Sequence, residues 1–188
     1  DLELAIQSHA TSKLKTSEDL FSVHSYGFRG EALASIAAVA RLSITSITAN
    51  ADHAGCLLVE NGQLQHIQPC AHPQGTRMVI ERLFHTVPAR KKFLKTARSE
   101  FAKIDEVLRS IVLANPKVSF TIWHNQAQHA HFSSDPSDSA QERLKAVLGE
   151  AFSQQAVAVS ATTSSWSLQG WVGSPRYSRR LADQQWWL

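Results

Sequence analysis

Two glycines, Gly27 and Gly30, precede a stretch rich in Ala, Leu and Ile that has the composition of a buried helix. A helix N-terminus presents unpaired backbone N–H groups, and glycine lets the backbone approach an oxyanion without a Cβ clash. The segment therefore indicates an anion site, above all one for phosphate. Taken alone, the pattern more often marks a simple turn. It is not a Walker A loop, because no Lys-Ser or Lys-Thr follows Gly30 at the required place.

Positive charge is concentrated in one part of the chain. Ten Lys/Arg stand against four Asp/Glu between Arg77 and Lys117, whereas the whole chain of 188 residues carries a net charge of only +3. Such a block is expected of a protein with a phosphate or nucleic-acid partner. A solvated helix face is the alternative interpretation.

The cysteines and histidines of the chain do not predict a disulfide framework, a metal site or a hydrolase. Cys56 and Cys70 are too few for a disulfide framework, and we expect a reduced, cytoplasmic setting. Together with His66 and His72 they could form a zinc site, but their spacing matches no standard ligand set, and we predict no metal here. No nucleophile-elbow sequence supports a hydrolase.

The elements that would position these residues mix helices and strands, which predicts an α+β fold. We expect helices over residues 31–40, 99–114 and 140–148, and strands near residues 42–45, 56–60, 63–68, 78–80, 118–122, 128–132, 156–161 and 166–172. Asn61-Gly62 is a strong two-residue hairpin signal. Capping residues over 16–19 predict a short helix through Val23.

The polar stretch over residues 133–139 is the best linker candidate, which places one domain over residues 1–134 and the start of a second α/β domain over 135–188. The first residue is not Met, and the last three are apolar, so we expect a chain cut from a longer protein. No stretch is apolar for long enough to span a membrane.

Several blocks, in the same order, resemble the MutL family of DNA mismatch repair proteins. They are His-Ala-Thr-Ser-Lys over residues 9–13, Gly-Phe-Arg-Gly-Glu-Ala-Leu over 27–33, Gly75-Thr76, Leu83-Phe84, and Pro-Ala-Arg-Lys-Lys-Phe-Leu over 88–94. This family shares its ATPase fold with the DNA gyrase B subunit, ninety-kilodalton heat-shock chaperones and histidine kinases. The resemblance implies part of a two-layer α/β sandwich of the GHKL ATPase type, with ATP covered by a flexible lid.

The resemblance implies an ATP site made of lid and triphosphate contacts, with one residue near the adenine. The residues carried over are Thr11, Ser12, Lys13, Gly27, Phe28, Arg29, Gly30, Glu31, Ala32, Leu33 and, near the adenine, Thr76. Lys13 could neutralise phosphate charge or be an ordinary surface lysine. Arg29 could pair with Glu31 or another acid, or reach phosphate.

No catalytic residue is assigned in this chain. The family's catalytic Glu, its Mg²⁺-supporting Asn and the adenine-binding Asp-x-Gly-x-Gly loop are expected upstream of Asp1, so Glu31 is rejected as general base and hydrolysis by this chain alone is not expected. ATP and Mg²⁺ are implied as cofactors. Thr86 stands where the family usually has Asn, which puts the geometry of that turn in doubt.

The function implied is an ATP-binding and ATP-hydrolysing switch that couples mismatch recognition to downstream repair factors. Its partners would be DNA, a mismatch-recognition protein, repair factors and a second protomer, in the bacterial cytoplasm at the nucleoid. DNA contact is predicted, through phosphates, for five residues: Arg90, Lys91, Lys92, Lys95 and Arg98. The alternative is a non-catalytic scaffold that binds DNA and protein. A gyrase- or chaperone-like relative is a third possibility, against which the 88–94 block argues.

Overall fold

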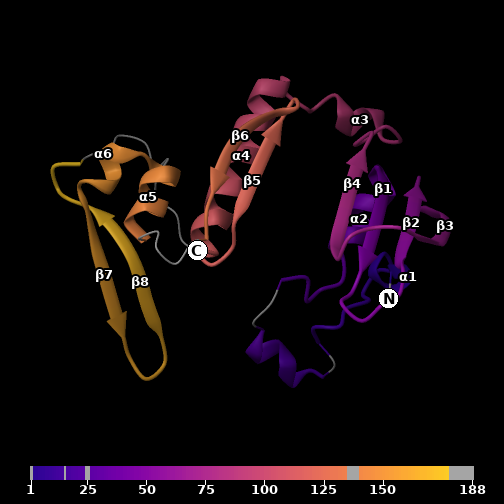
Figure 1. The fold of residues 1–188 in the computed structure, drawn as a ribbon, viewed down its shortest axis with the longest axis horizontal. Helices are drawn as coiled ribbons and strands as arrows, with labels where there is room; N and C mark the ends of the chain where they lie inside the picture. The colour runs from indigo at the N-terminus through magenta and orange to yellow at the C-terminus, as the bar shows by residue number, and fades with distance from the viewer. Residues whose placement is uncertain (1, 15, 24–25, 135–139, 178–188) are drawn as a thin grey trace. The chain divides into compact units, whose positions relative to one another are not determined.

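The computed structural model describes residues 2–14, 16–23, 26–134 and 140–177, which form two compact units, residues 1–95 and 96–188 (Figure 1). The linker expected over residues 133–139 lies largely outside the described ranges, as does the apolar tail at residues 186–188. The domain boundary between residues 134 and 135 therefore stays a prediction. Within the described ranges, no helix is long and apolar enough to cross a membrane.

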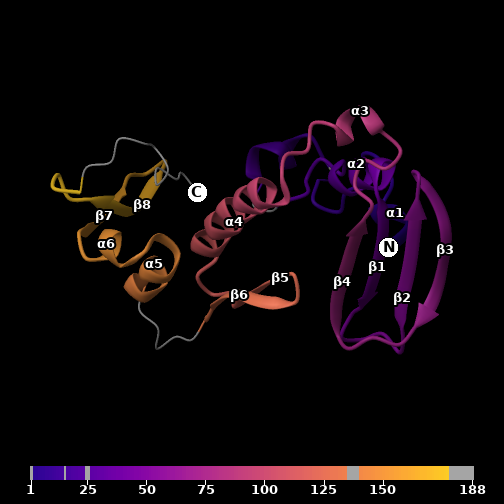
Figure 2. The same cartoon turned by 90° about the horizontal axis from the view of Figure 1, so that it is seen from above.

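The first unit is built on a four-stranded antiparallel sheet in the order β3-β2-β1-β4, seen side by side in Figure 2. Its strands are β1 (Arg41–Ile47), β2 (Ala54–Glu60), β3 (Gln63–Cys70) and β4 (Gly75–Glu81). Its helices are α1 (Leu2–Ala5), the 3-10 helix η1 (Glu18–Ser22), α2 (Ala32–Val39) and α3 (Pro88–Lys91). The strand predictions for this part of the chain are confirmed.

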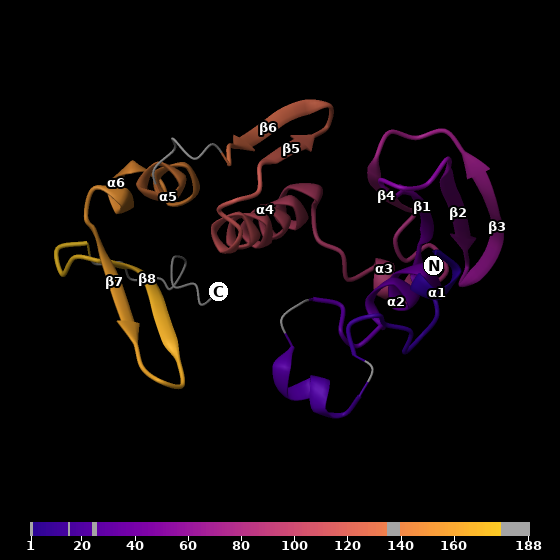
Figure 3. The ribbon, with the colours of Figure 1, turned by 60° about the horizontal axis from the view of Figure 1, so that its bottom comes forward.

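One face of the sheet is covered by helices α1 and α2, which lie on the same side in Figure 3. Leu42 and Ile44 of β1 alternate with polar residues, so both side chains point to this face and are buried. They pack with Leu57 and Val59 of β2 and with Ala37 of α2. Because α2 carries no charged residue, it can bury this side against the sheet, and the unit has two layers.

The C-terminal end of α2 is fixed by backbone hydrogen bonds from distant segments. The carbonyl of Ala37 accepts from the N–H of Gly62 at 3.0 Å, and that of Val39 accepts from the N–H of Phe84 at 2.7 Å. The last carbonyls of a helix lack partners within the helix and need others. Here the β2–β3 turn and the segment after β4 supply them.

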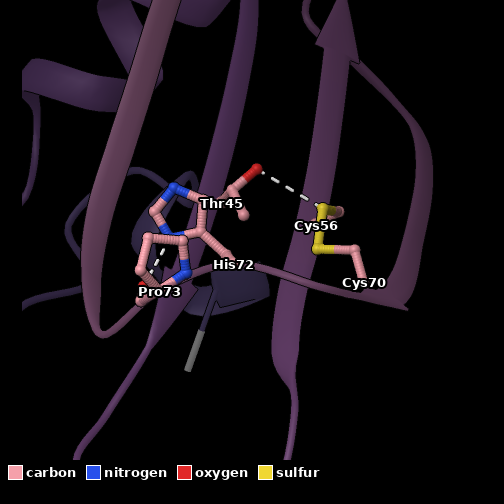
Figure 4. The surroundings of a disulfide bond; sticks show 5 residues. All are labelled: Thr45, Cys56, Cys70, His72 and Pro73. Carbon is pink, nitrogen blue, oxygen red and sulfur yellow. Dashed lines mark hydrogen bonds between the residues drawn. A yellow bond between two sulfur atoms is a disulfide. The ribbon is translucent and has the colours of Figure 1, made fainter.

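Asn61 and Gly62 form the predicted hairpin turn, both at positive φ as a type I′ turn requires (55° and 72°). The expectation that Cys56 and Cys70 are reduced is wrong. Cys56 of β2 and Cys70 of β3 form a disulfide, with their Cα atoms 6.0 Å apart (Figure 4). The two residues are not directly opposite in the strand register, where Cys56 faces Gln68 and Cys70 faces Ala54. A diagonal pair at this separation can still be bridged.

In its described residues, 96–134 and 140–177, the second unit contains two hairpins and three helices. Its elements are α4 (Ala97–Ala114), β5 (Phe120–His124), β6 (Ala127–Phe132), α5 (Ala140–Leu148), α6 (Glu150–Ser153), β7 (Ala156–Thr162) and β8 (Ser167–Gly173). The side chain of Thr96 caps α4 by accepting from the N–H of Ser99, and Asn115 closes the other end. Helix α4 packs beside the β5–β6 hairpin through Val112 and Ile122 (Figure 1).

A buried arginine, Arg143 of α5, connects three backbone segments of the second unit. Its guanidinium donates to the carbonyls of Asn115 and Val118 at 2.9 and 2.7 Å, and also to that of Ser133. A charged group can be buried only when hydrogen bonds replace its water. Arg143 therefore fixes α5 against the two ends of the β5–β6 hairpin.

Because of the disulfide, we expect reductant to lower the stability of the first unit. Its cysteines are 14 residues apart in sequence, and a bond that closes a loop of this size stabilises the folded state by about 3 kcal/mol, mainly by restricting the unfolded chain. We expect dithiothreitol to lower the urea midpoint followed by far-UV circular dichroism. A Cys56→Ser/Cys70→Ser variant should not respond to dithiothreitol. Two titratable thiols in the unreduced protein would contradict the bond.

Candidate functional site

The structure brings together two of the sequence blocks singled out above, residues 9–13 and 27–33. The hydroxyl of Thr11 donates to the carbonyl of Gly27 at 3.0 Å and accepts from the N–H of Lys13 at 3.1 Å. The Nδ1 atom of His9 lies 2.6 Å from a carboxylate oxygen of Glu31. Sixteen residues separate Thr11 from Gly27, so the contact is tertiary and joins the blocks into one surface.

Gly30 forms the closest approach in this junction. A Cβ atom built on Gly30 would lie only 2.5 Å from the carbonyl oxygen of Ala10, and Gly30 has a φ of +64°. Gly27 has a similar φ of +77°, but a Cβ there would meet nothing within 4 Å. Both residues adopt a conformation that favours glycine, and only Gly30 also needs to lack a side chain for packing. The close neighbour of Gly30 is thus the protein's own backbone.

Glu31 is the N-cap residue of helix α2, and its side chain makes no capping hydrogen bond. The N–H groups in the first turn of α2 therefore donate no hydrogen bond to the Glu31 side chain. Such donors at the positive end of a helix of eight residues can interact with an anion. The carboxylate of Glu31 instead lies beside the Nδ1 atom of His9.

The two basic side chains of the blocks make local contacts. The guanidinium carbon of Arg29 lies 5.5 Å from the centre of the Phe28 ring, a cation–π geometry. Among the described residues, this exposed side chain forms no ion pair with Glu31, which lies beside His9. The Nζ atom of Lys13 donates to the Ser12 hydroxyl at 3.0 Å, and both side chains are exposed. The ammonium of Lys13 has two further protons, which are available to an anionic ligand.

Residues 16–19, in the segment between the blocks, form the reciprocal capping arrangement predicted from the sequence. The N–H of Thr16 donates to the Asp19 carboxylate at 2.9 Å, and the N–H of Asp19 donates to the Thr16 hydroxyl at 3.4 Å. Hydrogen bonds from its own backbone N–H and from the hydroxyls of Ser17 and Thr16 hold the pKa of Glu18 below its usual value. Glu18, the first residue of η1, therefore stays charged.

Thr76 belongs to a different element, the start of β4. Its hydroxyl is 2.8 Å from the hydroxyl of Ser46 on β1. Sequence reasoning did not identify Ser46, because a serine in a strand carries no signal until the strand register is known. The register pairs Ser46 directly with Thr76.

The basic residues predicted to contact DNA lie in an exposed part of the chain. Arg90 and Lys91 end helix α3, Lys92 caps it, and all five residues from Arg90 to Leu94 are exposed. Lys95 is the last residue of the first unit, whereas Arg98 belongs to the second. The predicted DNA-contacting residues thus fall in two units.

Other polar residues considered from the sequence have structural partners. Both cysteine sulfurs are consumed by the disulfide, beside which the Thr45 hydroxyl lies 3.3 Å from the sulfur of Cys56 and His72 contacts the carbonyl of Pro73 (Figure 4). Their use as zinc ligands is therefore blocked in this structure.

In the second unit, the carboxylate of Asp105 lies 2.7 Å from Nε of Arg109 and 2.9 Å from Nε2 of His129. Burial by itself raises the pKa of Asp105, but the hydrogen bonds and charges of Arg109 and His129 outweigh it and lower that pKa. Arg109 also donates to the carbonyl of Val147. The cluster connects α4 to β6 and α5, and serves packing.

No family model matches the chain. Curated proteins named DNA mismatch repair protein MutL do match it. Those of Xanthomonas campestris pv. campestris and Thiobacillus denitrificans are 42% and 45% identical over 186 and 185 residues, each covering 98% of this chain. The chain spans about 30% of the length of these curated relatives.

Solved structures agree with this match. The Aquifex aeolicus MutL ATPase domain complexed with ADP is 26% identical, with a TM-score of 0.62 over 78% of this chain and 56% of that one. The N-terminal domain of a DNA repair protein has a TM-score of 0.70 at 22% identity, over 97% of this chain and 60% of that one, and shares the fold. The predicted α+β fold of the GHKL ATPase type is thereby confirmed.

The two glycines permit a matched test of the junction. Alanine at either position suffers the cost of a left-handed backbone, about 1–2 kcal/mol, but only Gly30→Ala also collides with Ala10. We expect Gly30→Ala to lower the free energy of unfolding by roughly 1–3 kcal/mol more than Gly27→Ala does. Limited proteolysis between residues 9 and 31 should accelerate in the same order. Equal effects of the two substitutions would remove the packing role of Gly30.

Proposed function

Since this chain is homologous to the MutL family of DNA mismatch repair proteins over 98% of its length, we propose that it forms the ATP lid and part of the supporting sheet of a nucleotide-driven repair switch. The observation that carries the proposal is the junction of residues 9–13 with residues 27–33. It gathers an uncapped helix N-terminus, a glycine-containing loop and the Lys13 ammonium on two hydrogen-bonded segments. These are the groups that recognise a triphosphate.

The chemistry of the two blocks suits the phosphates of ATP. Backbone N–H groups of Phe28, Arg29, Glu31, Ala32 and Leu33 would supply neutral donors, and Lys13 a mobile positive charge. The N–H of Gly30 already donates to the carbonyl of Gly27 at 3.2 Å, so Gly30 would shape the loop beside these donors. Thr11 and Ser12 would hold the first block in place, since Thr11 already bonds to Gly27 and Ser12 to Lys13. Thr76, on the sheet, would contact the adenine. ADP in the Aquifex aeolicus relative supports a nucleotide as the ligand.

Hydrolysis is proposed for the longer protein and not for these residues alone. Mg²⁺ would offset phosphate charge there. We assign Mg²⁺ no ligand in this segment, because none of its residues matches the family's Mg²⁺-supporting Asn. The catalytic base is likewise assigned to none of these residues, because none of them matches the motif in which the family carries its catalytic Glu. The segment would bind and orient the triphosphate.

In the cell, the ATP-bound form would associate with a second protomer and pass mismatch recognition to downstream repair factors at the bacterial nucleoid. DNA would be a direct partner. The exposed basic residues Arg90, Lys91 and Lys92 favour that contact, with Lys95 and, from its nearness in sequence, Arg98. The same block favours the second candidate function, a DNA- and protein-binding scaffold without nucleotide.

Removal of the Lys13 charge tests the nucleotide function. A charge-assisted hydrogen bond contributes about 1.5–3 kcal/mol, so Lys13→Gln in the complete gene product should weaken ATP binding by roughly ten- to a hundredfold. Adenosine, which has no phosphate, should bind equally to both forms. Calorimetric titration measures each Kd, and Lys117→Gln, at another exposed lysine, is the matched control. No ATP binding by the unsubstituted protein would favour the scaffold, and an unchanged Kd would remove the role of Lys13.

Charge reversal in the basic block tests the DNA contact. Lys91→Glu/Lys92→Glu should weaken binding to duplex DNA and reduce the slope of log K against log salt by about 2, since each lost phosphate contact contributes about 0.9. Fluorescence anisotropy over a range of salt concentrations gives the slope. Lys117→Glu/Lys145→Glu makes the same charge change elsewhere and should leave the slope nearly unaltered. Equal slopes for the two variants would show that the block does not bind DNA.

A further inference from the structure

The sheet carries a hydroxyl pair that joins its strands β1 and β4. Oγ of Ser46 and Oγ1 of Thr76 lie 2.8 Å apart, and the two residues are directly opposite in the β1–β4 register. Two residues before Ser46 on the same strand is Ile44, and alternation therefore places Ser46 on the face that holds the apolar core. Thr76 shares this face with Met78 for the same reason. The pair stands at the border of the core.

The two members of the pair differ in how firmly they are held. Ser46 lies on the central strand, where β1 pairs with β2 on one side and β4 on the other, and its side chain is half-buried. Thr76 lies on the edge strand β4, is exposed, and follows Gly75 at a φ of +128°. A hydroxyl on an exposed edge can rotate freely unless a partner restricts it. Ser46 is the partner that does so.

Such restriction matters for recognition of a base. A hydroxyl has one proton to donate and two positions at which it accepts. When one of these is committed to Ser46, the direction of the remaining ones is set before a ligand arrives. A preoriented group loses less freedom on binding and so discriminates better between ligands that differ in donor and acceptor pattern. Adenine and guanine differ in this way at ring position 6, where adenine has an amino group and guanine a carbonyl.

We propose that Ser46 is a positioning residue of the nucleotide site, which orients the Thr76 hydroxyl and thereby contributes to the preference for adenine over guanine. The proposal rests on the nucleotide function proposed above. It assigns Ser46 no contact with the reacting phosphates. Its effect reaches the ligand only through Thr76.

Nucleotide titrations of the complete gene product test this role. One neutral hydrogen bond corresponds to roughly a three- to tenfold change in affinity, so Ser46→Ala should weaken ATP binding by that factor and reduce the ratio of GTP Kd to ATP Kd. Ser46→Thr keeps a hydroxyl and should restore the ratio. The Thr76→Val variant should lose the same preference, and the double variant should lose little more, because both substitutions remove one interaction.

The control removes an equally short hydroxyl pair elsewhere. Ser119 and Ser134, in the second unit, have their oxygens 2.8 Å apart, and Ser119→Ala should leave both nucleotide affinities unchanged. If Ser46→Ala lowers the melting temperature and weakens ATP and GTP equally, Ser46 is only structural and the proposal is wrong. The proposal also fails if neither affinity changes. If the unsubstituted protein binds neither nucleotide, the proposed function is overturned first, and the role of Ser46 with it.

Discussion

Strand β1 depends on a single constraint, its pairing in register with a neighbour on each side, and most features of the first unit follow from it. The alternation of the strand sends Leu42 and Ile44 into the core, where they meet Leu57 and Val59 of β2. The same register places Ser46 opposite Thr76. A slip by one residue would turn the apolar side chains to the other face and separate the hydroxyl pair. Burial of the core thus also fixes the geometry of polar groups at its border.

The loop that leads into α2 depends on a different contact, the passage of one backbone against another. A glycine-rich loop before a helix is easily interpreted as a surface left open for a ligand. At Gly30 the space that a side chain would occupy is already filled by Ala10. The consequence for the proposed phosphate site is specific: Gly30 lets residues 9–13 approach, and in the proposed site a phosphate would meet the N–H groups of the helix start and Lys13. The packing contact and the proposed binding groups would then be neighbouring but different atoms of the same loop.

Local signals predicted much of the fold. Asn61-Gly62 determines its own turn, the apolar stripe of α4 identifies that helix, and the order of the family blocks indicated the fold class. The remaining features arise from residues that meet only after folding. Nothing in the sequence near Cys56 indicates that Cys70 will lie diagonally across a hairpin, because the bridge depends on register and twist. For Arg29 the sequence left an acidic partner and a phosphate as alternatives; its guanidinium lies over the Phe28 ring, while Glu31 lies beside His9. Arg143 looks like a surface residue of an amphipathic helix until three carbonyls converge on it.

Helix α2 is held unequally at its two ends. At its C-terminal end, the amides of Gly62 and Phe84 bond to the carbonyls of Ala37 and Val39, whereas its N-terminal end continues into the loop with Gly30. The helix could change its tilt only by breaking or lengthening these two bonds. Hydrogen–deuterium exchange at the two amides would consequently report on the orientation of the helix, although they lie 30 residues or more from Gly30 in the sequence. A movement of the loop that tilts the helix would thus change the exchange rates of the Gly62 and Phe84 amides, which lie outside the loop.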